Sequence, residues 1–95
     1  MADYAVRVEL RGNPSKEVYQ TLHALMARKG FAQTIAGVDA QGNQRRFSLP
    51  HAVYFGASGA DCGAVRDSVI GSVKGEVQED IIVFVVQAQT WSIGS

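Results

Sequence analysis

The sequence contains a single cysteine, Cys62, among its 95 residues. One cysteine cannot form an intrachain disulfide, and it cannot contribute to a zinc site built from paired cysteines. The histidines, aspartates and glutamates show no metal-ligand spacing either, so we expect no metal and no cofactor. A lack of disulfides is typical of proteins in a reducing compartment, and we predict a cytoplasmic location.

Net charge and long hydrophobic runs are also absent. Nine basic and nine acidic residues cancel, so no overall field attracts nucleic acid, and any RNA contact requires a local basic patch. No apolar stretch approaches the ~18 residues of a membrane span. The first residues lack a basic region followed by an apolar run. We therefore predict neither membrane insertion nor secretion.

The composition that remains is that of one folded domain. Hydrophobic residues make up 46% of the chain and charged residues 19%, which is typical of globular and not of disordered proteins. A chain of this length has room for one modest core. We predict a single domain over residues 1–95, with a C-terminal tail at about residues 89–95.

Apolar periodicity predicts the strands. Residues 4–10 alternate between apolar and polar or small side chains, as a half-buried strand does. Residues 37–46 contain no apolar run and are expected to form a hairpin connection or an extended loop. The predicted strands cover residues 4–10, 31–36, 52–57 and 81–86, with a short edge piece at residues 47–49. In the third strand, Val53 and Phe55 are expected to face inward and Tyr54 outward.

Two segments have helical spacing and end signals. Residues 14–29 carry one apolar stripe, with Asn13 as the expected N-cap and Pro14 at the first helical position. Residues 59–74 repeat valines at helical spacing, and Ser58 followed three residues later by Asp61 resembles a capping box. Several valines and internal glycines weaken this second helix, so tertiary packing has to stabilise it.

The order strand, helix, strand, strand, helix, strand predicts an α+β fold of the ferredoxin-like βαββαβ type. In this plan an antiparallel four-stranded sheet carries both helices on one face, and the first and third strands are central. The expected core combines the inward residues of those strands with the stripe of the first helix. Its predicted members are Val8, Leu10, Leu22, Leu25 and Phe55.

The last predicted strand, residues 81–86, is apolar on both faces. As an edge strand it would expose one of these faces unless something covers it. Either the C-terminal tail, with Trp91 and Ile93, folds over it, or a second copy of the chain buries it. We favour a homodimer formed through this strand.

Few side chains are candidates for catalysis. His23 lies beside the apolar stripe of the first helix, where it is either a proton-transfer group or a half-buried structural histidine. His51 follows Pro50 and is either a second proton-transfer group or an exposed loop residue. Cys62 matches the core stripe of the second helix and is interpreted as a structural thiol. Residues 56–59 form a small-residue turn that lacks the lysine of a phosphate-binding loop.

Basic residues offer a candidate local patch for RNA, although the net charge of the chain is zero. Two adjacent pairs would lie on one side of the domain if the end of the first helix met the following hairpin, and two further arginines lie on the polar face of the first strand. The candidate RNA-binding residues are Arg7, Arg11, Arg28, Lys29, Arg45 and Arg46.

The first sixty residues carry a family resemblance. The segments Tyr4-Ala5-Val6-Arg7-Val8-Glu9-Leu10, Leu22-His23-Ala24-Leu25-Met26, Gly30-Phe31 and Thr34-Ile35-Ala36, with Gly42, Arg46 and Leu49, resemble the GhoS family. That family consists of small ferredoxin-like antitoxins of type V toxin–antitoxin systems and is similar in fold to a group of CRISPR-associated endoribonucleases.

The resemblance implies an endoribonuclease that cleaves the messenger RNA of a small membrane-active toxin. The related CRISPR-associated fold carries an acidic residue at the end of its first strand, and Arg11-Gly12-Asn13 replaces it here. The implied mechanism is therefore metal-independent attack by the ribose 2′-OH. His23 or His51 would move protons, and Arg28, Arg45 or Arg46 would stabilise the phosphate.

A different class of function fits the same sequence. The chain could be a non-enzymatic, dimeric ferredoxin-like interaction module whose functional surface is the apolar last strand. Neutral charge favours this alternative. Cleavage of single-stranded RNA in EDTA would distinguish the two.

Overall fold

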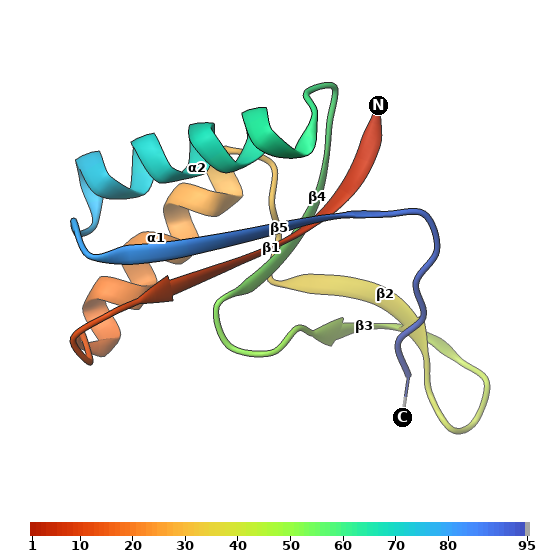
Figure 1. Cartoon of the computed structure of the whole chain (residues 1–95). Coiled ribbons are helices and arrows are strands. Elements are labelled where there is room, and N and C mark those ends of the chain that lie inside the picture. The colour runs from red at the N-terminus through yellow and green to blue at the C-terminus, as the bar shows by residue number, and fades with distance from the viewer. Residues whose placement is uncertain (95) are drawn as a thin grey trace.

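The computed structural model describes residues 1–94 and has a mixed α+β architecture (Figure 1). These residues contain two helices and five strands, and the strands form two antiparallel sheets. In chain order the elements are β1 (Ala2–Leu10), α1 (Lys16–Arg28), β2 (Thr34–Val38), β3 (Gln44–Ser48), β4 (Val53–Ser58), α2 (Cys62–Glu76) and β5 (Ile81–Ala88). The prediction of an α+β fold with antiparallel strands is confirmed.

Strand β1 is the middle strand of a three-stranded sheet with the order β4-β1-β5. Its register places Arg7 beside Val53 of β4 and beside Phe84 of β5. The predicted alternation of β1 is confirmed, because every second side chain is buried and Arg7 between them is exposed. The buried residues of β1 are Tyr4, Val6, Val8 and Leu10.

Both helices pack on the buried face of this sheet (Figure 1). One hydrophobic cluster joins the inward residues of β1 to apolar side chains from each helix. The helical members are Leu22, Leu25 and Met26 of α1 and Val65, Val69 and Val73 of α2. The opposite face of the three-stranded sheet carries no helix within residues 1–94, and we call it the open face.

Helix α1 begins later than its sequence predicted. The N-cap is Ser15, whose side chain makes no capping hydrogen bond, and Asn13 lies in the connection with a φ of 54°. Asn13 follows Gly12, which has a φ of 84°. These two left-handed residues turn the chain from β1 toward α1, and asparagine tolerates that conformation better than most residues. The N-cap prediction for Asn13 was therefore wrong.

Helix α2 is capped by Asp61 and not by Ser58. The Asp61 carboxylate accepts a hydrogen bond of 2.8 Å from the backbone N–H of Ala64. Ser58 instead accepts from the backbone N–H of Ala60 at 3.1 Å, inside the turn that precedes the helix. The capping residue is thus the acidic member of the predicted pair, where its charge also favours the helix dipole.

The predicted four-stranded sheet is wrong, because β2 leaves β4 and pairs with β3 in a separate two-stranded sheet. Only Ala32, just before β2, still pairs with β4, through two backbone hydrogen bonds of 2.8 Å with Phe55. As a result β4 is not a central strand. The hairpin occupies much of residues 37–46, the segment expected to be a hairpin connection or an extended loop. Sequence periodicity missed it because most of its side chains are exposed on both faces.

The hairpin turn is built from polar residues. The Asp39 carboxylate accepts hydrogen bonds from the backbone N–H groups of Gln41 and Asn43, at 3.0 and 2.9 Å. Gly42 adopts a φ of 80°, which a glycine accepts at no steric cost. These local bonds close the turn without any apolar contact, so the signal for the hairpin lies in turn chemistry and not in hydrophobic pattern.

In β4 the inward residue is Tyr54, and the prediction of Phe55 as a core residue is wrong. Tyr54 is fully buried under the helices. Phe55 points to the open face and contacts Trp91, with ring centroids 4.6 Å apart. Gly56 follows, and a side chain there would collide with the carbonyl of Gly30. The other four predicted core residues are all buried.

The C-terminal tail turns away from β5 and runs along the hairpin (Figure 1). Trp91 packs on Phe55, and the backbone N–H of Val38 donates to the carbonyl of Ile93 at 3.3 Å. Gly94 forms a parallel bridge with Val38. The tail therefore ties the two-stranded sheet to the three-stranded one. Within residues 1–94, no helix is both long enough and apolar enough to cross a membrane.

Candidate functional site

Four aromatic side chains meet between α1 and the start of β4, and we call them the His–Tyr cluster: Tyr19, His23, His51 and Tyr54. The ring centroids of His23 and His51 are 6.4 Å apart, in an edge-to-face arrangement. His23 Nδ1 lies 2.7 Å from the Tyr54 hydroxyl. Tyr19 contacts His51 edge-on at 4.3 Å between centroids. The two predicted proton-transfer residues are thus brought together by the fold.

Helix α1 and strand β4 position the inner half of the cluster. Tyr19 and His23 are four residues apart and lie on the same side of α1. Tyr54 reaches them from the buried face of β4, and its hydroxyl contacts the His23 ring instead of water. In β4, Tyr54 faces the helices and Phe55 faces the open face. The same alternation therefore gives His23 its hydrogen-bond partner, the Tyr54 hydroxyl.

A tight turn positions His51. The backbone N–H of Val53 donates to the carbonyl of Pro50 at 3.0 Å, which closes a four-residue turn around His51 and Ala52. Ala52 has a φ of 61°, a left-handed conformation that costs a residue with a side chain about 1–2 kcal/mol. Its carbonyl accepts from the N–H of Val8 at 3.0 Å, so central strand β1 helps hold the strained turn.

Burial controls the protonation of Tyr54 and His23. Burial raises the pKa of Tyr54, and the coulombic effect of Tyr19 adds to the rise, so Tyr54 remains a neutral hydroxyl. Burial also lowers the pKa of His23, and the nearby His51 lowers it further. His23 is therefore a neutral imidazole near neutral pH. The site holds one histidine that is ready to accept a proton.

The Tyr54 hydroxyl can serve either tautomer of His23. If the hydroxyl donates to Nδ1, the proton of the neutral ring lies on Nε2, and Nε2 is a donor. If Nδ1–H donates to the tyrosine oxygen, Nε2 is free to accept a proton. His23 can thus give or take a proton at Nε2 while the bond to Tyr54 holds the ring in place.

Acid should destabilise the wild-type fold more than it destabilises His23→Asn. The folded-state pKa of His23 is below that of the unfolded chain, so the unfolded chain binds more protons as the pH falls. The stability contributed by neutral His23 is full above about pH 6.5 and is lost as the pH falls toward the lowered value. Urea unfolding between about pH 8 and pH 5 measures this. Parallel pH curves for the two proteins would contradict it.

The six predicted RNA-binding residues lie at three places in the fold. They fall into three groups: Arg7 on β1 with Arg11 just after that strand, Arg28 and Lys29 at the end of α1, and Arg45 and Arg46 on β3. Within residues 1–94, no hydrogen bond joins any of them to the cluster. Their contact with RNA stays a prediction.

Most of these basic side chains already have partners. Arg28 donates to Glu76 at 2.8 Å, and Lys29 donates to Ser68 at 2.9 Å, so both connect α1 to α2. On the hairpin, the Arg46 guanidinium donates to the side-chain oxygen and carbonyl of Thr34, at 3.0 and 2.9 Å. The Arg45 guanidinium lies over the Phe47 ring, 4.7 Å from its centroid.

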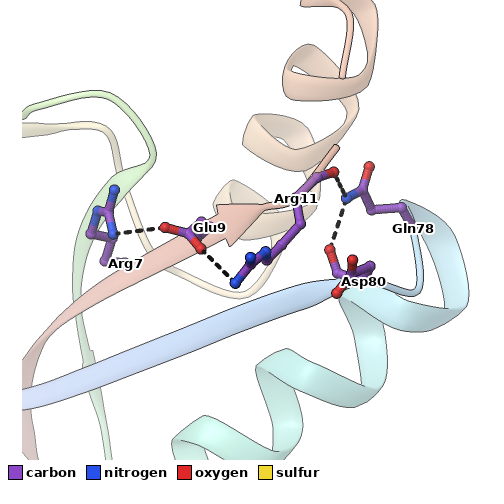
Figure 2. Close-up of polar contacts among 5 residues, drawn as sticks. All are labelled: Arg7, Glu9, Arg11, Gln78 and Asp80. Atoms are coloured by element: carbon purple, nitrogen blue, oxygen red, sulfur yellow. Dashed lines mark hydrogen bonds and ion pairs between the residues drawn. The ribbon is translucent and has the colours of Figure 1, made fainter. Parts of the chain in front are cut away.

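Arg7 on β1 and Arg11 just after it share one acidic partner, as Figure 2 shows. Each guanidinium lies 3.7 Å from a carboxylate oxygen of Glu9, which stands between Arg7 and Arg11. The Gln78 amide donates to the carbonyls of Arg11 and Asp80, and this contact fixes the end of β1 to the start of β5 (Figure 2). The polar row on β1 therefore carries both signs of charge.

The remaining candidates from the sequence are Cys62 and the small-residue turn before α2. Cys62 is a half-buried free thiol packed against the core. A cavity of about 120 Å³ near the start of α2 is lined in part by Ser58, Ser68 and Lys29. Its only ammonium group is that of Lys29, which already donates to Ser68. Among residues 1–94, no three His, Cys, Asp or Glu side chains are placed to hold a metal ion.

Tyr19 and Tyr54 are the cluster residues that sequence reasoning missed. A signal for Tyr19 was present, because it stands one helical turn before His23 on the same face of α1. No comparable signal existed for Tyr54, since its role depends on the phase of β4. No protein-family model matches the chain, and no curated protein matches it. The resemblance to the GhoS family therefore stays a prediction.

Proposed function

We propose that this protein is a metal-independent endoribonuclease of the GhoS antitoxin type, which cleaves the messenger RNA of a toxin. The observation that carries the proposal is the His–Tyr cluster, in which His23 and His51 lie 6.4 Å apart between ring centroids. Two imidazoles at such a separation can act on opposite sides of one phosphodiester. General acid and general base catalysis of this kind accelerates a reaction by typically ~10²–10⁴-fold.

The strand order supports a ferredoxin-like origin for the fold. A ferredoxin-like sheet has the order of β5, β1, β4 and then the strand after the first helix, with both helices on one face. The first three are present in this order, and Ala32 keeps two hydrogen bonds to β4 where the fourth would lie. We interpret the chain as a ferredoxin-like domain whose second strand has separated from the sheet to form the β2–β3 hairpin.

In the proposed reaction, the 2′-OH of one ribose attacks the adjacent phosphorus. Neutral His23 accepts the hydroxyl proton at Nε2 while Tyr54 holds Nδ1. The bond between phosphorus and the 5′-oxygen of the next nucleotide breaks, and His51 donates a proton to that leaving oxygen. The products are a 2′,3′-cyclic phosphate and a free 5′-hydroxyl. Each proton removed at the base side is balanced by one supplied at the acid side.

RNA cleavage in EDTA tests the proposal. A single-stranded RNA rich in U and A should be cut at preferred positions, and the fragments should end in a 2′,3′-cyclic phosphate. DNA of the same sequence is the matched control, because it lacks the nucleophile and should remain intact. RNA left intact by the purified wild-type protein would overturn the nuclease proposal. Cleavage that stops in EDTA would overturn its metal independence.

The antitoxin part of the proposal has its own test. A toxin-specific nuclease should shorten the lifetime of one transcript that encodes a short membrane-active peptide, and the gene of that peptide should lie beside the gene of this protein. Transcript half-lives measured with and without expression of the protein would show whether one transcript is shortened in this way. A uniform effect on all transcripts would support a general nuclease and contradict the antitoxin role.

A non-enzymatic interaction module is the second candidate function. The observation that favours it is the row of exposed apolar side chains Ile82, Phe84 and Val86 on β5. The absence of RNA cleavage together with self-association through this row would support the module. The two candidates differ in the surface they use, since the His–Tyr cluster lies against α1 and the apolar row lies on the open face.

A further inference from the structure

We propose that β5 is a dimerisation edge. In the inferred dimer, β5 of a second copy pairs antiparallel with β5 of the first across a two-fold axis near Phe84. The two three-stranded sheets then form one continuous sheet. This inference is independent of the nuclease proposal, because it involves no residue of the His–Tyr cluster.

The two edges of the three-stranded sheet are not equivalent. At the β4 edge, Ala32 exchanges two hydrogen bonds of 2.8 Å with Phe55, so that edge is partly occupied. At the β5 edge, no strand within residues 1–94 pairs with the outer side of Ile81–Ala88. Every second residue of this strand therefore presents an unpaired N–H and C=O outward. Such an edge is a template for another strand.

The β5 edge also lacks the usual protection against pairing. Natural edge strands are commonly shielded by charged side chains, prolines or bulges. Residues 81–88, Ile-Ile-Val-Phe-Val-Val-Gln-Ala, contain no charged residue, no proline and no glycine. A strand without charge can lie beside its own copy without like-charge repulsion. This property makes the edge self-complementary, as a two-fold interface requires.

The side chains beside this edge are apolar and exposed. Ile82, Phe84 and Val86 are 49%, 63% and 42% exposed, and all three point to the open face. In a dimer with its axis near Phe84, the two rows become neighbours across the junction and form one apolar surface. Cross-strand packing of aromatic and β-branched residues stabilises such a junction.

The chain's own tail does not cover this row. Trp91 packs on Phe55 of β4, and Ile93 and Gly94 contact Val38 of β2. The tail thus runs on from the end of β5 and turns toward β4 and the hairpin (Figure 1). The described tail residues are engaged elsewhere, and the occupant of the β5 edge has to come from another molecule.

The surroundings favour a second copy over a nucleic acid. The polar row next to β5 is Arg7, Glu9 and Arg11, in which each arginine lies 3.7 Å from the same carboxylate. A row of mixed sign offers little attraction to a polyanion. Two of the three apolar side chains are aliphatic, and they cannot stack on bases as aromatic rings do. An uncharged strand of the same sequence matches this surface better.

The size of the interface sets the expected affinity. Two paired strands and their apolar rows bury less than the ~1,200 Å² of a typical stable complex. The dimer should therefore be reversible, with a dissociation constant in the range of about 10–100 µM. The average mass measured by sedimentation should rise with concentration from near one chain to near two chains.

A charge placed at residue 84 tests the interface. Phe84 is mostly exposed in one chain, so Phe84→Lys should leave the fold intact, and it should weaken the dimer at least about tenfold by placing two ammonium groups across the axis. Val38→Lys is the matched control, because Val38 is a similarly exposed apolar strand residue on β2. This variant should dimerise like the wild type.

Mixing two variants tests the two-fold geometry. Phe84→Lys and Phe84→Glu should each be monomeric alone, and an equimolar mixture should form a heterodimer because opposite charges then face each other. A wild-type mass of one chain at about 1 mM would overturn the proposal. It would also be overturned if Phe84→Lys dimerised normally, if Val38→Lys abolished the dimer, or if the mixture stayed monomeric.

Discussion

Replacing His51 with alanine should reduce the rate of RNA cleavage by about 10²–10⁴-fold, which is the usual contribution of one proton-transfer group. His51 is exposed and makes no side-chain hydrogen bond within residues 1–94, so its removal should leave the fold unchanged. His23→Asn should cause a similar loss, because asparagine can keep a hydrogen bond to Tyr54 but cannot transfer a proton at the position of Nε2. Initial rates on one defined RNA substrate measure both effects.

The pH profile separates a catalytic role from a structural one. A pair in which one histidine accepts a proton and the other donates one should give a bell-shaped dependence of kcat/KM on pH. The limb on the acid side should follow the lowered pKa of His23. In the His51→Ala variant the remaining activity should keep an acid-side limb, and this limb should move to higher pH because His51 no longer lowers the pKa of His23. Gln20→Ala, an exposed change on the same helix, is the control and should retain full activity. Full activity in His51→Ala would exclude His51 from the reaction.

Leu22→Ala should lower the free energy of unfolding by about 2–5 kcal/mol. Leu22 is fully buried, and it belongs to the cluster that joins α1 to β1 and α2. Truncation there removes apolar contacts and leaves a cavity that surrounding strands and helices cannot easily close. A loss of this size is a large part of the ~5–15 kcal/mol that stabilises a small domain. Urea denaturation followed by circular dichroism measures it.

The control for Leu22→Ala is Val38→Ala, which removes an apolar side chain that is 49% exposed on β2. Its effect should stay within about 0.5 kcal/mol. Both measurements belong at a protein concentration well below that of any dimer, since self-association adds to apparent stability. A loss of less than about 1 kcal/mol in Leu22→Ala would show that this residue does not anchor the core.

Local sequence pattern predicted most of the regular elements. The alternation along β1 and the apolar stripes of α1 and α2 depend on the two-residue and 3.6-residue periods of one segment, and each period can be recognised without knowing the partner. This explains why Val8, Leu10, Leu22 and Leu25 were correctly predicted to be buried. It also explains the correct prediction of an α+β chain with antiparallel strands.

The phase of β4 shows where local pattern fails. Val53, Tyr54 and Phe55 are all large enough to fill a core, so alternation cannot decide which of them faces inward. The decision depends on two distant partners. His23 offers a hydrogen bond to the Tyr54 hydroxyl on the buried face, and Trp91 offers an aromatic contact to Phe55 on the open face. A buried tyrosine is acceptable only where its hydroxyl finds such a partner.

The sequence by itself determined the types of most of the elements, the stripe of α1, the neutral charge and the uncharged, doubly apolar character of β5. Tertiary structure alone decided that β2 leaves the main sheet, that the tail covers β4 and not β5, and that His23 and His51 meet. The physical reason is how far apart in the sequence the contacting residues lie. A helix or strand pattern arises from neighbouring residues, whereas strand partners and side-chain clusters depend on contacts between segments that are remote in the chain.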